Sequence, residues 1–415
     1  MFRIAVVGGR PAPIAGAKEL GIDVVLVHEP GKYHPSIAAH CEQIVHASVE
    51  DSAEILQVLR PLHAKRPFDR VMTTAEIAAV STGQVVDTLG LPGVGEATAL
   101  ALKDKSLTRQ CLDQRGLSPV RFAVLESAEQ AADFYDKVGG RIVIKPIDGA
   151  ASLRINLVDS AAAAAEVFTS LLAEGVLNPI AEEYLDGPVV SVDSISFNGR
   201  HVPIGYSEYR MNDRFVEWEV STPSRVALPY LDQLRTLTPQ LLDAVGLTEG
   251  PSHSEFVLTE SGPRVLESHA RLAGSGAPEL VRRAFGYDLN RMMMTVPLQI
   301  DPLPESSPDP IAGAAVRFFT PMAGKIERID IAEDIQSIVR RLPVGVTPDV
   351  FLPFLDEFRD MEIAAAVTKN VGDEVPPLLT VADCVSGYVI ATGRDREDAV
   401  RRCDEVNDKI RIETS

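Results

Sequence analysis

Three side chains that can bind charged groups stand at alternate positions in the stretch RVLESHARLAG, residues 264–274. They are Glu267, His269 and Arg271. Because successive side chains of an extended strand point to opposite faces, these three share one face. A carboxylate suits a hard cation, an imidazole can carry a proton, and a guanidinium is a permanent donor to anions.

The segment SEFVLTESGPRVLES predicts a β-hairpin that brings a second carboxylate to this face. A three-residue loop centred on Ser261 places Glu255 opposite Glu267 and Phe256 opposite Leu266, and a glycine bulge would shift this register by one residue. Like charges that face each other on a sheet are unfavourable. A Mg²⁺ ion held by both carboxylates would compensate them. An exposed sheet face of mixed charges is the alternative interpretation.

Two lysines lie where phosphates could be bound. Lys145 ends the apolar run RIVIK and precedes the loop IDGAAS, which includes Ser152. Small residues in such a loop let backbone N–H groups approach phosphate oxygens. Lys105, in LKDKSLTRQ, belongs to an amphipathic segment. Taken singly, each lysine is more typical of a solvated surface residue.

The stretch AEEYLDG adds a strand that runs into two acids, Glu182 and Glu183, followed by Tyr184 and Leu185. The backbone amides and carbonyls at the end of this strand could meet the edge of an adenine ring.

Composition limits the classes of function. A chain of 415 residues allows two to four domains. The net charge of −19 argues against nucleic acid as a partner, which Lys/Arg surfaces bind. The four cysteines lie far apart without a CxxC pair, which argues against a zinc site or a disulfide framework. No membrane-spanning run and no signal-peptide pattern is present, so a cytoplasmic location is expected.

The first hundred residues alternate between expected strands and helices, which predicts a parallel sheet covered by helices. The strands are FRIAVVGG, DVVLVHE, EQIVHAS and FDRVMTT, and the helices are IAGAKELG and DSAEILQVLRPL. The pair Gly8–Gly9 is not followed by a GxGxxG pattern, so a nicotinamide site is not favoured.

Further along, one helix is expected over residues 97–116, and strands and helices alternate until about residue 185. Consecutive strands after Gly187 suggest an antiparallel sheet. Residues 301–313, rich in Pro, Asp and Ser, form the best linker candidate. The remaining residues have a mixed α/β pattern.

In this order the segments resemble the ATP-grasp family of carboxylate–amine and carboxylate–thiol ligases, and among these the amino-acid (dipeptide) ligases. The resemblance rests on DKSLTRQCLDQRGLSP, IVIKPIDGAAS, AEEYLDGPVVSVD and SEFVLTESGPRVLESHARLAG. It implies an α/β protein in which two α+β subdomains clasp ATP. The expected division is a Rossmann-like domain over 1–96, an ATP-grasp domain over 97–300 with a lid over about 117–185, and a mixed α/β C-terminal domain over 301–415.

The resemblance also implies roles for residues of the nucleotide site. Phosphates would contact Lys105, Lys145 and the loop with Ser152, and adenine and ribose would contact the hinge. Mg²⁺, as two ions or with Mn²⁺ as an alternative, would bind the carboxylate pair. Arg271 would stabilise the transferring phosphoryl group. The implied hinge residues are Glu182, Glu183, Tyr184 and Leu185, and the implied metal ligands are Glu255 and Glu267.

Candidate substrate residues follow from the same resemblance. The start of a helix at Gly274, Ser275 and Gly276 would bind a substrate carboxylate. The strand YSEYRMNDRFVEWEVSTPSR carries Arg210, which could hold a carboxylate bidentately, and Glu217 or Glu219, which could receive an ammonium group. An exposed, charged strand is the alternative.

Three departures from the family pattern stand out. The family usually has Asn where this chain has His269, so this histidine could bind substrate, carry a proton from the attacking amine, or only pack. A commonly acidic ribose-binding position falls near Val189 or Val190, which leaves that contact to Glu182 or Asp193. The phosphate loop has a single glycine.

The function that these features predict is an ATP-dependent, ADP-forming carbon–nitrogen ligase. It would phosphorylate a carboxylate and couple the acyl phosphate to an amine, most simply joining amino acids into a dipeptide-like amide. Its partners would be ATP, small carboxylate and amine substrates and a second copy of the chain, without nucleic acid or membrane. The alternatives are a purine-pathway ligase or carboxylase, and a catalytically silent nucleotide-binding regulatory protein.

Overall fold

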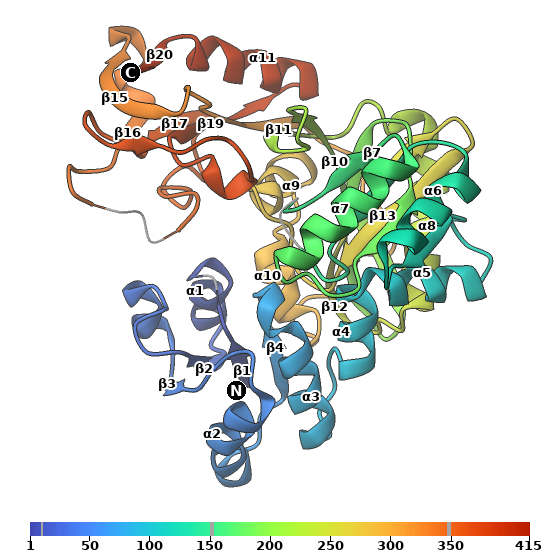
Figure 1. The fold of residues 1–415 in the computed structure, drawn as a ribbon. Helices are drawn as coiled ribbons and strands as arrows, with labels where there is room; N and C mark the ends of the chain where they lie inside the picture. Colours follow the sequence, from blue (N-terminus) through green and yellow to red (C-terminus); the bar gives the residue numbers. More distant parts are fainter. Residues whose placement is uncertain (10, 150–152, 347–349) are drawn as a thin grey trace.

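The N-terminal part of the computed structural model is a parallel sheet with helices on its faces, as expected (Figure 1). The structure describes residues 1–9, 11–149, 153–346 and 350–415. The strand order is β3-β2-β1-β4, and every residue of β1 is buried. The elements are β1 (Arg3–Val7), α1 (Pro11–Glu19), β2 (Asp23–His28), β3 (Gln43–His46), α2 (Ser52–Lys65), β4 (Arg70–Thr73) and α3 (Ala79–Leu89).

The helix expected over residues 97–116 is two helices, α4 (Glu96–Lys103) and α5 (Lys105–Gln114). Asp104 separates them because its backbone is extended and its side chain accepts from the backbone N–H groups of Ser106 and Leu107. It therefore caps α5. This break places Lys105 at the first position of α5, where its side chain is buried.

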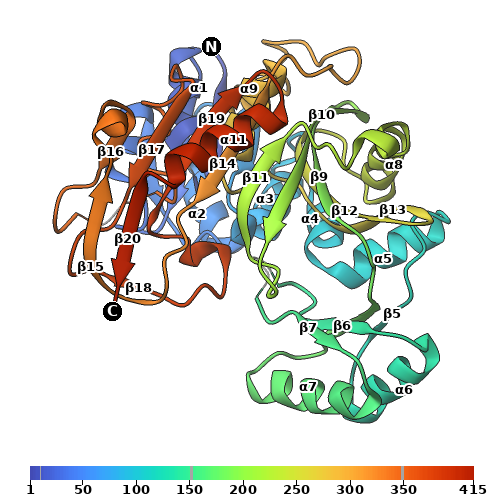
Figure 2. The ribbon, with the colours of Figure 1, turned by 90° about the horizontal axis from the view of Figure 1, so that it is seen from above.

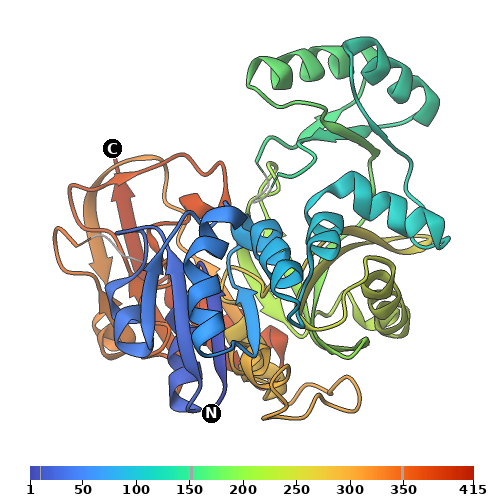
Figure 3. The same cartoon turned by 90° about the horizontal axis from the view of Figure 1, so that it is seen from below.

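The lid is a four-stranded antiparallel sheet with the order β5-β8-β6-β7, and it stands off from the body of the molecule (Figures 2 and 3). Ser127 and Ser160 cap its two helices, which pack against each other. Its elements are β5 (Phe122–Val124), α6 (Ala128–Val138), β6 (Ile142–Lys145), β7 (Asn156–Val158), α7 (Ala161–Ala173) and β8 (Ile180–Glu183).

The centre of the molecule is a nine-stranded sheet with the order β13-β12-β9-β10-β11-β14-β19-β17-β16. The consecutive strands expected after Gly187 form its first half and pair antiparallel. The elements before the linker are β9 (Val189–Phe197), β10 (Arg200–Met211), β11 (Glu217–Thr222), α8 (Leu231–Ala244), β12 (Gly250–Thr259), β13 (Gly262–His269), α9 (Ala277–Phe285) and α10 (Leu289–Thr295).

The C-terminal segment extends this sheet. The proline-rich stretch 301–313 leads from α10 into β14, which pairs with β11. The division at residue 301 stays a prediction, because the ladder of hydrogen bonds crosses it. The C-terminal elements are β14 (Gly313–Phe318), β15 (Gly324–Ile331), β16 (Val339–Arg341), β17 (Ile363–Val367), β18 (Glu374–Val375), β19 (Gly387–Gly393), α11 (Arg396–Asn407) and β20 (Ile410–Thr414).

One hydrophobic core joins the three parts of the chain. It contains Ile4 of β1, Val265 of β13, Met292 of α10 and Tyr388 of β19, all nearly or fully buried. Helix α10 packs against α1, so the N-terminal sheet contributes one face to this core. Among the described residues, no helix is long and apolar enough to cross a membrane.

The predicted hairpin is present with a different turn. Thr259 pairs with Gly262, so the connection has two residues, and a bulge after Glu255 shifts the register. The predicted pair of Glu255 and Glu267 is confirmed, because the bulge compensates for the shorter turn. The predicted pairing of Phe256 with Leu266 is wrong, since Phe256 lies opposite Val265.

The start of β19 offers a test of the C-terminal fold. Gly387 has φ +124°, and a Cβ there would lie 2.0 Å from the carbonyl oxygen of Ala366. We expect Gly387→Ala to lower the free energy of unfolding by about 2–4 kcal/mol, measured by chemical denaturation. Gly372→Ala is the control, because Gly372 also has a positive φ but has no atom within 4 Å of its Cβ position. Equal effects of the two substitutions would contradict this expectation.

Candidate active site

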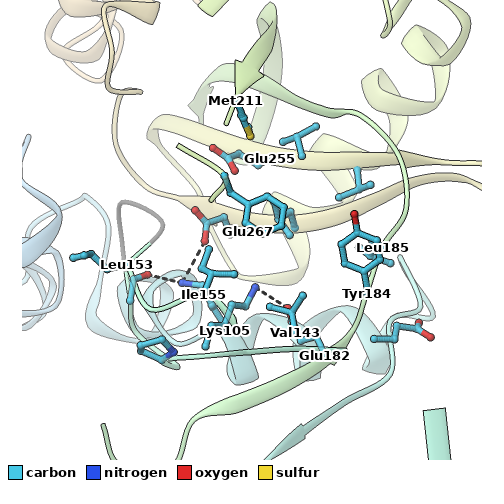
Figure 4. Close-up of a pocket in the computed structure, with 18 of the residues that line it drawn as sticks. Lys105, Val143, Leu153, Ile155, Glu182, Tyr184, Leu185, Met211, Glu255 and Glu267 are labelled. Atoms are coloured by element: carbon cyan, nitrogen blue, oxygen red, sulfur yellow. Dashed lines mark hydrogen bonds and ion pairs between the residues drawn. The ribbon is translucent and has the colours of Figure 1, made fainter. Parts of the chain in front are cut away.

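One pocket between the lid and the central sheet is lined by most of the residues that were predicted to bind nucleotide and metal. Figure 4 shows Tyr184 and Leu185 at one end of it and Glu255 and Glu267 at the other. Ser152 lies outside the described residues. The predicted residues in the pocket wall are Lys105, Lys145, Glu182, Glu183, Tyr184, Leu185, Glu255 and Glu267.

Apolar side chains that were not predicted form much of the remaining wall. They are Val143, Ile155, Met211, Val257 and Leu266, and they come from both the lid and the central sheet. An apolar layer of this kind, with a few polar groups at its ends, suits a planar ring such as a nucleobase. The alternation of apolar and charged residues on β12 and β13 was the available signal.

The carboxylates of Glu255 and Glu267 lie side by side on β12 and β13. The Nζ atom of Lys105 is 3.3 Å from Oε2 of Glu267 and donates to the carbonyl oxygen of Gly149 at 2.6 Å. Burial raises the pKa of Glu267, but Lys105 and His269 outweigh it and hold that pKa well below its usual range. The carboxyl group of Glu267 is therefore ionised at neutral pH and could bind a cation.

This pair fits the Mg²⁺ that ATP-grasp proteins use. Mg²⁺ is usually held by one or two carboxylates while phosphate oxygens and water supply the other ligands. Within residues 1–9, 11–149, 153–346 and 350–415, no group of three or more His, Cys, Asp or Glu side chains converges to hold a metal ion alone. The donor set therefore suits a metal that arrives with phosphates.

Glu182 is buried between two cations. Its Oε2 lies 2.7 Å from Nζ of Lys145, and its Oε1 lies 2.5 Å from Nε of Arg109. Burial opposes ionisation, but Arg109 and Lys145 outweigh it and lower the pKa of Glu182 from 4.5 to about 2.

Two expectations change as a result. Lys105 and Lys145 are buried instead of solvated, with side chains 9% and 5% exposed. The carboxylate of Glu182 is already paired, so it is not available to the ribose. The carboxylate of Glu183, which also belongs to the pocket lining, pairs with Arg121 at 2.7 Å.

Asp193, the other candidate for the ribose, lies elsewhere. It is 1% exposed on β9, and its Oδ1 is 2.9 Å from Nδ1 of His253. Nε2 of the same histidine is 3.3 Å from Oε1 of Glu255. Burial lowers the pKa of His253, but Asp193 and Glu255 outweigh this and raise it to about 10. Asp193 is therefore linked to Glu255 through His253.

His269 and Arg271 meet an acid from the N-terminal domain that was not predicted. Nε and Nη2 of Arg271 lie 2.8 and 2.6 Å from Oε2 of Glu76. His269 lies between Glu267, at 3.2 Å, and Glu76, at 3.5 Å. Arg271 follows the end of β13, so it is not on the strand as expected. The signal for Glu76 was its position after the carboxyl end of a parallel strand, where ligands usually bind.

The candidate substrate residues separate onto two faces of the sheet. A bulge lies where Arg210 pairs with Glu219 and Met211 with Glu217, so Glu217 faces the pocket side with Met211. Its Oε1 accepts from the hydroxyl of Ser275 at 2.5 Å. Burial raises the pKa of Glu217 above its ordinary value, and the hydrogen bond from Ser275 only partly opposes this effect.

Arg210 and Glu219 lie on the opposite face, where they pair at 3.2 Å. Asp404 of α11 approaches Arg210 at 4.0 Å. Arg210 and Glu219 therefore do not share a face with Glu217, because the bulge reverses the alternation of side chains at Trp218, and their role in substrate binding stays a prediction.

The glycine-rich stretch before α9 lies where the sequence predicts. Gly274, Ser275 and Gly276 precede the first helical residue, Ala277, and Gly276 has φ +79°. This left-handed conformation favours glycine and turns the chain into the helix. At the start of α9 the N–H groups of Ala277 and Glu279 donate to the carbonyl oxygens of Gly274 and Gly276, and Pro278 has no N–H group. An anion site here would therefore depend on the N–H groups of the preceding turn.

Three family models match successive parts of the chain. The ATP-grasp N-terminal domain matches residues 14–93, the ATP-grasp domain matches residues 138–279, and the L-amino acid ligase C-terminal domain 2 matches residues 355–415.

Curated relatives are similar at low identity. The L-arginine-specific L-amino acid ligase of Bacillus subtilis is 22% identical over 72% of this chain and 75% of its own length. The alanine–anticapsin ligase of Bacillus subtilis strain 168 is 22% identical over 55% of this chain. An uncharacterized protein of Sinorhizobium fredii is 25% identical over 64% of this chain. The chain spans about half the length of the last two, 53% and 56%.

Solved structures agree on the fold. The L-amino acid ligase of Bacillus licheniformis has a TM-score of 0.79 at 20% identity, covering 100% of this chain and 99% of its own. The phosphoribosylglycinamide synthetase of Anaerococcus prevotii has a TM-score of 0.72 at 17% identity, covering 100% of both chains.

The pocket lies between the lid and an antiparallel sheet, and lysines and carboxylates line it. This arrangement is the ATP-grasp fold, as predicted. The chain thus carries the ATP-grasp domains, and its residues 355–415 are similar to the C-terminal domain 2 of the L-amino acid ligases. The predicted resemblance to ADP-forming carbon–nitrogen ligases is confirmed at this level.

The charge state of Glu182 leads to a testable pH dependence. A carboxyl group whose pKa falls on folding contributes stability above its unfolded pKa, and this contribution is lost as the pH falls through the folded value. We compare the free energies of unfolding of the wild type and Glu182→Gln. We expect their difference to be constant above about pH 5 and to shrink by about 3 kcal/mol between pH 4.5 and 2.

Chemical denaturation of both proteins at several pH values measures this difference. Glu174→Gln is the control, because Glu174 forms an exposed ion pair with Arg154. A difference between wild type and Glu182→Gln that does not change from pH 7 to pH 2 would show that Glu182 is not held ionised by its neighbours.

Proposed function

We propose that this protein is an ATP-dependent ligase that joins two amino acids, or an amino acid and a related acid, through an amide bond and releases ADP and phosphate. The observation that supports this best is the position of the carboxylate pair. Glu255 and Glu267 line the pocket with the two buried lysines, and Glu255 also interacts electrostatically with Glu217 of the neighbouring substrate region.

The proposed reaction has two steps. A carboxylate oxygen of the first substrate attacks the γ-phosphorus of ATP, and the bond from phosphorus to the ADP oxygen breaks. The amine nitrogen of the second substrate then attacks the acyl carbon, the bond to the phosphate oxygen breaks, and the amine loses a proton. Lys105 and Lys145 would bind the phosphates, and Mg²⁺, when bound to Glu255 and Glu267, would supply further positive charge.

The residues around Arg271 fit the transfer region. Arg271 would stabilise the phosphoryl group in transfer, and His269 would accept the proton of the amine. Glu76 holds both side chains, and its own pKa is lowered by His269 and Arg271 against the effect of burial. His269 lies beside the candidate metal ligand Glu267, and Glu76 links this histidine to Arg271.

Substrate binding would use the pocket-facing residues of β11 and α9. Glu217 would receive the ammonium group of an amino acid, and Gly274, Ser275 and Gly276 would present N–H groups to a carboxylate. A half-buried carboxylate with a raised pKa, such as that of Glu217, gains stabilisation when a cation arrives, which favours an ammonium ligand.

Three finer features belong to the same proposal. Two Mg²⁺ ions would bind between the carboxylate pair and the phosphates, with Mn²⁺ as an alternative. The protein would act in the cytoplasm. It would form a homodimer, and analytical ultracentrifugation would test this oligomeric state.

The test of the function is release of ADP and phosphate with ATP, Mg²⁺ and each of the twenty amino acids, singly and in pairs, with mass spectrometry of the products. We expect release with particular pairs and a product at the summed mass less one water. Binding of ATP without release for any pair would contradict a ligase of proteinogenic amino acids.

Glu217 gives a sharper test once a substrate pair is known. We expect Glu217→Gln to raise the KM of one amino acid by about 10- to 100-fold, because its ammonium group loses the carboxylate with which it would pair. The KM of ATP should stay unchanged, because ATP does not contact Glu217 in this proposal. Steady-state kinetics with each substrate varied measures this. Asp213→Asn, at an exposed position of the β10–β11 turn, is the control. An equal rise in all KM values would contradict the assignment.

A further inference from the structure

Arg109 is a buried cation that reaches three acceptors on two elements. Its side chain is 3% exposed. Nε donates to Oε1 of Glu182 at 2.5 Å, Nη1 donates to the carbonyl oxygen of Val265 at 2.6 Å, and Nη2 donates to that of Leu266 at 3.2 Å. All three nitrogens of the guanidinium fork are used, a geometry that a lysine cannot reproduce.

The two elements joined by Arg109 carry different parts of the candidate nucleotide site. Glu182 belongs to β8 at the hinge of the lid, and its other oxygen holds Lys145. Val265 and Leu266 belong to β13, directly before the metal-ligand candidate Glu267. Arg109 itself comes from α5, which begins at Lys105.

We infer that Arg109 is a positioning residue that fixes Lys145 relative to Glu267. This inference rests on the proposed nucleotide site. Arg109 does not belong to the described residues that line the pocket, so it would act through its neighbours. One arm is ionic: Arg109 orients Glu182, and Glu182 orients Lys145. The other arm consists of hydrogen bonds and holds the backbone of β13 in place.

The two arms predict different results for two substitutions. Arg109→Lys keeps a charge beside Glu182 but cannot also reach both carbonyl oxygens. Arg109→Met removes the charge and the donors. Lys145 binds phosphate without a metal, whereas Glu267 acts through the metal, so nucleotide affinity with and without Mg²⁺ separates the arms.

The experiment measures the affinity of the full chain for ADP by calorimetry, in EDTA and in Mg²⁺. We expect Arg109→Met to lose about 10- to 100-fold in both conditions, as happens when other outer-shell partners are removed. We expect Arg109→Lys to keep the affinity in EDTA and to lose most of the gain that Mg²⁺ gives the wild type. Arg115→Met, at an exposed position just after the same helix, is the control.

A double-mutant cycle tests the ionic arm. If Arg109 acts on Lys145 through Glu182, the losses caused by Arg109→Met and Glu182→Gln in EDTA do not add, because both remove the same link. Additive losses would overturn the ionic arm. If Arg109→Met does not fold, Arg109→Lys alone decides, through its loss of the Mg²⁺ gain.

Other outcomes are also decisive. Wild-type affinities of both Arg109 variants in both conditions would overturn the inference while leaving the proposed function intact. Equal losses by Arg109→Lys and Arg109→Met that match their losses of thermal stability would show a general structural role and would also overturn it. Failure of the wild type itself to bind ADP would instead contradict the proposed function, on which the inference rests.

Discussion

Glu255 and Glu267 stand side by side on neighbouring strands, and the repulsion between them governs how the surrounding charges are arranged. Each carboxylate has basic side chains beside it. Lys105 and His269 lie beside Glu267, and His253 lies beside Glu255. Lys105 and His269 hold the pKa of Glu267 well below its usual range, and an ionised carboxylate is the form that binds a divalent cation.

The same principle applies one layer deeper in the molecule. Glu182 is fully buried and is balanced by Arg109 and Lys145, so Lys145 in the pocket wall is linked through Glu182 to Arg109, which lies outside the described pocket lining. A buried ion pair of this kind adds little to stability relative to an apolar core, and its retention is explained better by the geometry that it imposes. The site thus depends on contacts between residues more than seventy positions apart.

The sequence predicts the parts of the site that follow from local alternation. The pairing of Glu255 with Glu267, the parallel N-terminal sheet and the helix start at Gly276 were predicted correctly, because each depends on strand periodicity or on a glycine.

The differences arise where a single extra residue changes the direction of side chains, or where a distant segment supplies the partner of a side chain. The bulge at Trp218 sends Arg210 and Glu219 to the face opposite Glu217, and alternation alone cannot reveal it. Glu76, Arg109 and His253 were missed because their partners are brought to them by tertiary structure, and Asp193 was misplaced for the same reason.

The pairing of β11 with β14 links the substrate region to the C-terminal segment by backbone hydrogen bonds. Exchange of that segment between related proteins would therefore break a sheet in its middle and expose two new edges. Pocket-facing residues of β11, such as Glu217, and the strand that supports them would have to change together during evolution. A recombinant protein that exchanges the C-terminal segment should therefore keep β11 and β14 from the same parent.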